Sequence, residues 1–275
     1  MSSDGQGSQE NSIHEIDCPE KIRFFEMLYE RSTGGWRMPP WLDKDNAFSP
    51  EKVEEWSLQC PIWFSPVERE VAWFYESFIK LVGARTVLET GTNAGYSTAR
   101  IACGLRYNGN DSIVYTFDIG PAEHIFLGTE LEKYVKFIQG SSLEAEFDNT
   151  IELDLMILDS DHTYDTIIKE IIRFEPQLKV GGTMLLHDSI YFDGVGHAVI
   201  QLMKSDRFEV ITLPTPRDNG IGSRRPGLTI VRKVKAQING SDLRFEQEWS
   251  GIEIGRDQMK TSSIIDIIYH KAPDF

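Results

Sequence analysis

Short runs of apolar and β-branched residues recur from residue 86 to residue 233, and stretches with helical periodicity separate several of them. The runs predicted as strands are Thr86–Thr90, Ile113–Asp118, Val135–Gln139, Asp154–Asp159, Thr183–His187, Phe208–Leu213 and Leu228–Lys233. Alternating strands and helices are typical of a parallel sheet that is covered on both faces. The connection between the last two runs is too short for a helical crossover, so this pair is predicted to be antiparallel. The pattern therefore predicts an α/β fold.

Two helices next to these strands have clear sequence signals. The first is predicted from Ser65 to about Val82, because Ser65 can cap it, Pro66 suits its first position and Glu68 can close a capping box. The second is predicted over residues 166–178, between the fourth and fifth strands. Both helices would cover the sheet.

The length of 275 residues accommodates one large α/β domain with additions. We place this domain at residues 61–234. It follows a disordered tail at residues 1–16 and a helical N-terminal extension at residues 17–60, which is either a lid over a pocket or an ordinary packing layer. Residues 235–275 form a C-terminal extension, whose apolar segment at residues 264–269 could serve as a homo-oligomer interface.

Charge and composition exclude several classes of partner. A net charge of −15 argues against a nucleic-acid substrate, since phosphate backbones need compensating Lys and Arg. No apolar stretch approaches the length of a membrane-spanning helix, and the polar N-terminus lacks the features of a secretion signal. Three scattered cysteines are too few for a disulfide framework or a zinc module. We therefore expect a cytoplasmic protein with no membrane partner.

The first predicted strand leads into a glycine-containing turn and then into helix-forming sequence. Gly91 permits a sharp turn and Gly95 a close approach of a ligand or helix to the backbone. The spacing differs from the G-x-G-x-x-G of dinucleotide sites, and Glu89 would repel a pyrophosphate. A cationic ligand without phosphate is a better match, and S-adenosylmethionine has this character. The turn residues predicted to bind it are Glu89, Gly91, Thr92, Asn93, Gly95, Tyr96 and Ser97.

Ligands of open parallel sheets bind beyond the carboxyl ends of the strands, so the polar residues there are further candidates. Asp118, at the end of the second strand, is placed to accept hydrogen bonds from ribose hydroxyls; the alternative is a helix cap or a solvated acid. After the third strand, Ser141 and Ser142 are candidates for holding the adenine, although serine is also common there as a cap. Asp159, at the end of the fourth strand, completes the predicted cofactor set.

Two apolar strands end in a combination of acids and histidines. Asp159, His187 and Asp188 could form a divalent metal site, with the identity of the metal left open because imidazole suits Mn²⁺, Fe²⁺ or Zn²⁺ better than Mg²⁺. His162 is the candidate general base, since imidazole titrates near neutral pH. The alternative is that such histidines cap helices or complete hydrogen bonds.

Together these residues resemble the class I S-adenosylmethionine-dependent methyltransferases. Within that class, the chain is similar to the small-molecule O-methyltransferases of the macrolide-sugar (macrocin-type) and aminocoumarin-sugar group, with cephalosporin hydroxylase-like relatives. The resemblance runs from about residue 61 to residue 234 and is carried by Glu89–Ser97, Asp118, Asp159–Tyr164, Gly181–Gly182 and His187–Asp188. It implies a Rossmann-like, doubly wound sheet of seven strands, mostly parallel with an antiparallel last strand.

The resemblance also implies roles for the acids and histidines. In metal-dependent members, three carboxylates at the positions of Asp159, His187 and Asp188 bind Mg²⁺, and a histidine that matches His162 acts as the base. This chain differs because His187 stands where an acid is expected, so His187 could instead be a second base or orient the acceptor.

The predicted activity is methyl transfer from S-adenosylmethionine to a hydroxyl of a small molecule, such as a sugar, a phenol or a natural-product intermediate, with possible assistance from Mg²⁺ or Mn²⁺. Two alternatives are a nicotinamide-dependent oxidoreductase on a Rossmann-like sheet and a catalytically inactive cofactor-binding module. The glycine spacing disfavours the first, and the many ionisable groups along one rim argue against the second.

Overall fold

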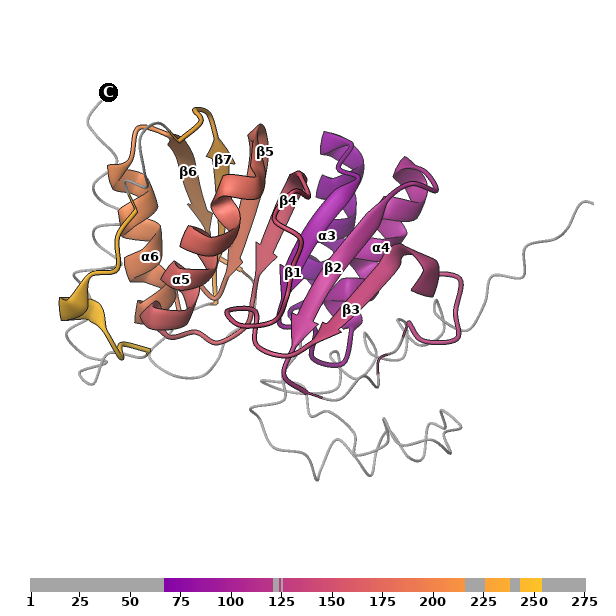
Figure 1. The fold of residues 1–275 in the computed structure, drawn as a ribbon, viewed down its shortest axis with the longest axis horizontal. Helices are drawn as coiled ribbons and strands as arrows, with labels where there is room; N and C mark the ends of the chain where they lie inside the picture. Colours follow the sequence, from indigo (N-terminus) through magenta and orange to yellow (C-terminus); the bar gives the residue numbers. More distant parts are fainter. Residues whose placement is uncertain (1–66, 121–123, 125, 216–225, 238–242, 254–275) are drawn as a thin grey trace, which may run out of the picture.

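The computed structural model describes residues 67–120, 124, 126–215, 226–237 and 243–253. They form a seven-stranded sheet in the order β3-β2-β1-β4-β5-β7-β6 (Figure 1). Its strands are β1 (Thr86–Thr90), β2 (Ile113–Asp118), β3 (Val135–Gln139), β4 (Leu153–Leu158), β5 (Leu178–His187), β6 (Phe208–Leu213) and β7 (Leu228–Lys233). β7 runs antiparallel to both of its neighbours, β5 and β6, and the other neighbouring strands are parallel to each other. The predicted Rossmann-like α/β fold is therefore confirmed.

Two pairs of helices cover the two faces of the sheet (Figure 1). The helices α3 (Arg69–Val82) and α4 (Tyr96–Asn108) pack on one face, and α5 (Tyr164–Phe174) and α6 (Asp193–Lys204) pack on the other. Short 3₁₀ turns lie at Glu132–Tyr134 (η1), Glu175–Gln177 (η2) and Gln247–Trp249 (η3). Because side chains of a strand alternate between faces, each central strand contributes to both cores.

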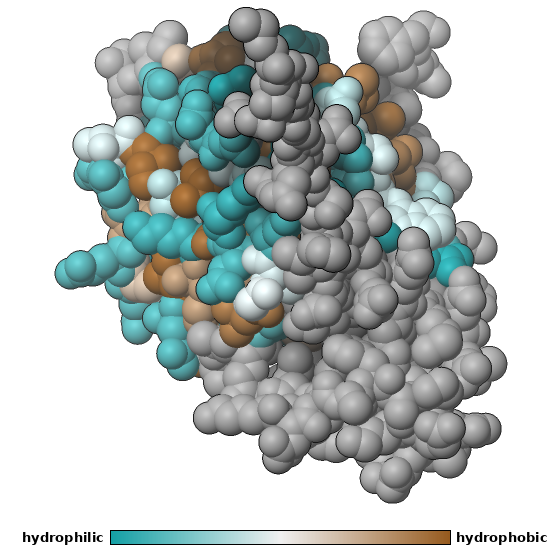
Figure 2. All heavy atoms as spheres, turned by 90° about the vertical axis from the view of Figure 1, so that its right-hand side faces the viewer, coloured by the Kyte–Doolittle hydropathy of each residue, from teal (hydrophilic) through white to brown (hydrophobic). Residues whose placement is uncertain are grey.

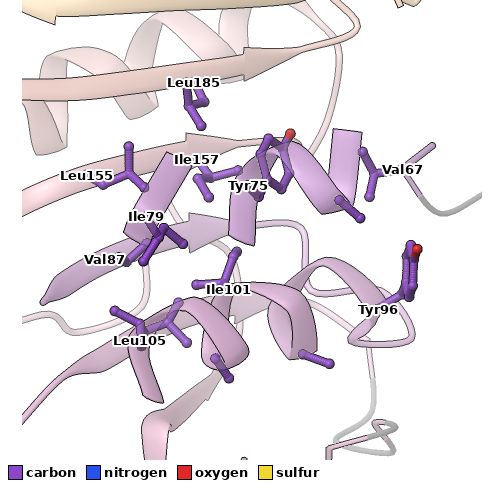
Figure 3. Packing of buried hydrophobic residues seen from close by; sticks show 14 of the residues in the cluster. Val67, Tyr75, Ile79, Val87, Tyr96, Ile101, Leu105, Leu155, Ile157 and Leu185 are labelled. Atoms are coloured by element: carbon purple, nitrogen blue, oxygen red, sulfur yellow. The ribbon is translucent and has the colours of Figure 1, made fainter. Parts of the chain in front are cut away.

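The alternation is clearest in β4. Leu155 and Ile157 belong to the core beneath α3 and α4, whereas Met156 and Leu158 belong to the core beneath α5 and α6. Figure 3 shows the first of these cores, where Tyr75 of α3 lies beside Ile157. The same parity decides to which side the polar residue that follows each strand points.

Most strand boundaries agree with the prediction from the sequence, and two differ. β4 begins and ends one residue early, at Leu153 and Leu158. β5 begins at Leu178 rather than Thr183, because Leu178 already pairs with Leu153 of β4 before a register shift. The residues between Leu178 and Thr183 are largely exposed, and the buried half of the strand follows them. α5 begins at Tyr164, two residues before the predicted start, because Thr163 caps it by accepting a hydrogen bond from the Thr166 amide.

The predicted capping box is wrong for Glu68. Glu68 has extended backbone angles of φ −58° and ψ 145° and precedes α3, so it is not the third residue of the helix. Ser65 and Pro66 lie outside the described residues. The carboxylate of Glu68 bonds instead to groups at the sheet edge, as described below.

Residues 243–253, which belong to the predicted C-terminal extension, pack on α5 and α6. Leu243 is buried in their core, and Ile252 accepts a hydrogen bond from the Tyr164 amide at 2.8 Å. This segment therefore lies against the second helical layer. The predicted tail at residues 1–16, the extension at residues 17–60 and the apolar segment at residues 264–269 fall outside the described residues.

A bilayer requires a certain length and hydropathy of the helices that cross it. Among the described residues, no helix is both long and apolar enough to cross a bilayer. On the face shown in Figure 2, hydrophilic side chains cover much of the described surface and surround separate apolar ones.

Candidate functional site

The turn between β1 and α4 is pressed against the tip of β4. Gly91 has a φ of +86°, and a Cβ atom there would lie 2.0 Å from the carbonyl oxygen of Asp159. The amides of Gly91 and Thr92 donate to the carbonyl of Phe117 at 2.9 and 3.3 Å. Asn93 continues the turn at a φ of 47°, a conformation that asparagine tolerates better than most residues. The turn thus follows a fixed path on which position 91 has no room for a side chain.

Gly95 closes the turn at the start of α4. It has a φ of +81°, and a Cβ atom there would lie within 3.0 Å of the Phe126 ring and of His124. The helix begins at Tyr96, whose side chain is buried, so the first turn of α4 presents its backbone rather than bulky side chains to the loop. The free amides of such a turn suit a polar or anionic ligand group.

Glu89 lies beneath this turn. Its carboxylate is 1% exposed and accepts hydrogen bonds from Ser97 at 2.6 Å, Thr98 at 2.5 Å and Thr116 at 2.7 Å. Burial raises the pKa of Glu89 to about 7, and the three hydroxyls oppose that rise. In the structure Glu89 therefore holds β1, β2 and the first turn of α4 together. Its predicted direct contact with a cofactor stays a prediction.

Asp118 ends β2 and joins two loops. Its two carboxylate oxygens accept the amides of Asn93 and Gly120, each at 2.7 Å. The side chain is partly exposed and lies beside the turn after β1. Asp118 and the glycine turn thus lie side by side, and the carboxylate of Asp118 can accept further hydrogen bonds from a ligand.

The two serines after β3 have different surroundings. The hydroxyl of Ser141 accepts the Leu143 amide at 3.2 Å, which is the capping role that competes with ligand binding. Ser142 is buried and donates to Glu170 of α5. Glu170 is fully buried and also accepts hydrogen bonds from Ser160 at 2.7 Å and Thr90 at 3.2 Å. Burial raises the pKa of Glu170 to about 7.

Glu89 and Glu170 form a matched pair on opposite faces of the sheet. Thr90 follows Glu89 in β1, so their side chains point to opposite faces. Each glutamate accepts hydrogen bonds from three hydroxyl groups: those of Glu89 come from α4 and β2, and those of Glu170 come from the end of β1 and the loops after β3 and β4. These two carboxyls hold the rim of the site in place from beneath.

Asp159, His162 and Asp188 lie close enough together to hold a metal ion. One ligand atom from each lies within 4.8 Å of those of the other two. The Nε2 atom of His162 is 3.0 Å from Oδ2 of Asp188 and 3.6 Å from Oδ1 of Asp159. Asp188 has a φ of 57°, so the chain reverses immediately after β5. That reversal turns the carboxylate of Asp188 toward His162.

His162 has an unusual environment for a predicted base. Its ring stacks on Phe192 with a centroid distance of 4.0 Å. Although Nε2 is buried and close to both carboxylates, it is not aligned for a hydrogen bond with any described group. Burial lowers the pKa of His162, but Asp159 and Asp188 outweigh this effect and raise it to about 10. His162 therefore holds its proton at neutral pH, and it can act as a base only after that proton has been displaced.

His187 does not join this group in the way predicted from the sequence. It is 3% exposed, with Nε2 2.6 Å from Oε2 of Glu68 and Nδ1 3.1 Å from Oδ1 of Asp159. Burial opposes the charged form, but Asp159, Asp188 and Glu68 raise the pKa of His187 well above its usual range. Both ring nitrogens of His187 face carboxylates, and the ligand atoms that come together in the described residues are those of Asp159, His162 and Asp188. The predicted role of His187 as a metal ligand stays a prediction.

Sequence reasoning also missed Glu68, Glu170 and Tyr75. The parity of β5 would have placed His187 on the same face as Leu185, beneath α3. An acid at the start of α3 is then a natural partner. Tyr75 of α3 is fully buried, and its hydroxyl has no hydrogen-bond partner in the described part of the chain. No pattern in the sequence distinguishes it from an ordinary core tyrosine.

Comparison with known proteins agrees with this geometry. Residues 88–189 match a family model described as a methyltransferase domain. This part of the chain is similar to methyltransferase domains. It contains the glycine turn, Asp118 and the group formed by Asp159, His162 and Asp188. The comparison with curated proteins gives no match.

Solved structures share the fold of this chain. The O-methyltransferase TomG from Streptomyces achromogenes, involved in tomaymycin synthesis and solved with S-adenosylmethionine, is 17% identical with a TM-score of 0.53. The match covers 62% of this chain and 82% of that one. An O-methyltransferase from Bacillus cereus in complex with SAH is 18% identical with a TM-score of 0.50, covering 61% and 83%. Both share the Rossmann-like α/β fold of this chain.

Proposed function

We propose that this protein is an S-adenosylmethionine-dependent O-methyltransferase that acts on a hydroxyl group of a small molecule. The observation that carries the proposal is the position of Asp159, His162 and Asp188 directly beside the glycine turn after β1. The carbonyl of Asp159 contacts Gly91 closely, so a cofactor bound at the turn and an acceptor bound at the acids would be neighbours. Methyl transfer needs this proximity.

The cofactor fits the residues at the tips of β1 and β2. Gly91 and Gly95 leave the backbone open to close approach, and Asp118 offers a carboxylate to ribose hydroxyls. Glu89 adds an acidic group beneath the turn, which disfavours a diphosphate. When bound, S-adenosylmethionine supplies an activated methyl group, and the chain has to align it with an acceptor. The O-methyltransferases of this fold from Streptomyces achromogenes and Bacillus cereus, which are solved with S-adenosylmethionine and SAH, support this choice.

A divalent cation fits the group formed by Asp159, His162 and Asp188. Two carboxylates and an imidazole whose buried Nε2 has no aligned partner in the described part of the chain make a plausible donor set. When bound, such a cation would lower the pKa of the acceptor hydroxyl. Imidazole binds a metal in its neutral form, so cation binding is expected to release the proton of His162. Mn²⁺ suits this mixed set better than Mg²⁺.

Side chains of the protein hold the groups of the site in position. Phe192 fixes the ring plane of His162 by stacking, and the positive φ of Asp188 directs its carboxylate to the same point. Glu89 and Glu170 hold the surrounding loops from beneath. An acceptor hydroxyl that reaches this point would therefore meet a preorganised polar site rather than mobile side chains.

The direct test is transfer of labelled methyl from S-adenosylmethionine to a panel of sugars, phenols and hydroxylated natural-product intermediates. We expect product with added Mn²⁺ or Mg²⁺ and a strong reduction with a chelator. Asp188→Asn should reduce turnover at least tenfold while SAH still binds. The proposal fails if SAH does not raise the thermal stability of the protein but NAD does, since only a ligand of the native state stabilises it.

A further inference from the structure

Glu68, at the start of α3, reaches across to the catalytic edge of the sheet. Its Oε2 atom is 2.6 Å from Nε2 of His187, and both side chains are almost completely buried. Its Oε1 atom accepts a hydrogen bond from the hydroxyl of Thr215 at 2.7 Å. The two oxygens thus join three separate segments: the residue before α3, the end of β5 and the short segment that follows β6.

His187 extends this contact to the predicted metal group. Its Nδ1 atom is 3.1 Å from Oδ1 of Asp159 and 3.4 Å from Oδ2 of Asp188. Carboxylates accept hydrogen bonds, so both ring N–H groups of His187 donate, one to Glu68 and one to Asp159. A buried ring held at both ends cannot rotate without losing a charge-assisted hydrogen bond.

We propose that Glu68 is a positioning residue which, through His187, fixes the carboxylate of Asp159 at the metal group. The inference rests on the proposed function and adds a residue outside the matched domain at residues 88–189. Partners that orient a metal ligand commonly change metal affinity by about 10–100-fold. Glu68 does not contact Asp159 itself; it acts on Asp159 through the imidazole of His187.

The hydrogen bond from Thr215 gives Glu68 a second role. Thr215 also accepts the Gly227 amide at 3.0 Å, which joins the two ends of the connection between β6 and β7. Glu68 therefore ties the base of this connection to the same ring that orients Asp159. Loss of Glu68 should loosen both attachments at once.

The test compares Glu68→Gln with Glu76→Gln in the full chain. Glu76 is on the same helix and pairs with Lys80 at 2.5 Å and Arg100 at 2.8 Å, away from the site, so its replacement controls for a general disturbance of α3. Glu68→Gln keeps the size of the side chain and removes its charge. The measurements are Mn²⁺ affinity by electron paramagnetic resonance and SAH affinity by calorimetry.

We expect Glu68→Gln to weaken Mn²⁺ binding about tenfold or more while SAH affinity changes less than about threefold. Glu76→Gln should leave both affinities near those of the wild type. The slowly exchanging ring N–H signals of His187 in ¹⁵N-edited spectra should be lost in Glu68→Gln and kept in Glu76→Gln.

Three results would overturn the inference: unchanged Mn²⁺ affinity in Glu68→Gln, an equal loss of Mn²⁺ and SAH binding, or retained His187 ring signals. A wild-type protein that binds neither Mn²⁺ nor SAH contradicts the proposed function itself. A wild type that binds SAH, with Mn²⁺ affinity unaffected by Glu68→Gln, contradicts only the role of Glu68.

Discussion

Replacing Gly91 by alanine should lower the free energy of unfolding in two ways, through an unfavourable backbone angle and through steric overlap with Asp159. A control variant separates the two. Gly91 has a φ of +86°, and an added Cβ would lie 2.0 Å from the carbonyl oxygen and 2.6 Å from the carbonyl carbon of Asp159. Gly83 offers a matched control, because it has a φ of +66° and no heavy atom within 4 Å of an added Cβ. Both variants strain the backbone, but only one creates an overlap.

The magnitudes follow from these two environments. A left-handed conformation costs an L-residue about 1–2 kcal/mol, and alanine recovers about 0.4–1 kcal/mol by restricting the unfolded chain. Gly83→Ala should therefore lower the free energy of unfolding by about 1 kcal/mol or less. Overlap with backbone atoms that cannot rotate away adds about 1–3 kcal/mol, so Gly91→Ala should lower it by about 2–4 kcal/mol.

Urea denaturation and an SAH titration of each variant measure the two effects. Relief of the overlap must push the turn away from the tip of β4, so Gly91→Ala should also lose at least tenfold in SAH affinity. Gly83→Ala, which lies at the far end of α3, should bind SAH as the wild type does. Equal losses of stability in the two variants, or unchanged SAH binding in Gly91→Ala, would refute the reasoning.

Three further predictions concern buried groups. Tyr75→Phe should raise the free energy of unfolding by about 1 kcal/mol in chemical denaturation, because it removes a buried hydroxyl without a partner in the described part of the chain; a loss of stability would show that this hydroxyl has a partner. Burial raises the pKa of Glu170 from 4.5 to about 7, so its stabilising contribution is complete below pH 4.5 and is lost as pH rises through 7. Between pH 4.5 and pH 8 the wild type should lose up to about 3 kcal/mol relative to Glu170→Gln, and parallel pH profiles would contradict this. Gly194→Ala should destabilise the protein by about 2–3 kcal/mol, since the added Cβ would lie 2.4–2.5 Å from the backbone of His162, Tyr164 and Ile252; a change below about 0.5 kcal/mol would contradict the packing at this position.

The strands could be predicted from the sequence because hydrophobic burial on both faces leaves a strong local pattern. β1, β2 and β3 have the predicted boundaries; β1 and β2 contribute buried residues to the sheet, and β3 contributes half-buried ones. The start of β5 was missed because residues 179–182 are mostly exposed and include two glycines, so they carry no apolar signal. Pairing with β4 holds this segment in place instead.

The site could be predicted at the level of the strand tips but not at the level of side-chain direction. The sequence placed Asp159, His162, His187 and Asp188 at one rim, and the structure brings these four together. Both histidines lie beside the acids, and the direction from which each approaches them depends on the left-handed turn at Asp188 and on the parity of β5. Glu68 was misassigned because its spacing from Ser65 satisfies a local capping pattern, whereas its actual partners are far away in sequence.

The central claim is that the turn after β1 and the acid at the end of β2 bind the adenosyl part of the cofactor. Calorimetric titration of SAH into the wild type and Asp118→Asn tests it most directly. We predict one site per chain in the wild type and an affinity at least tenfold weaker in the variant, because the amide loses a charged acceptor for ribose hydroxyls. Absence of binding to the wild type, or equal affinity in both proteins, would contradict the claim.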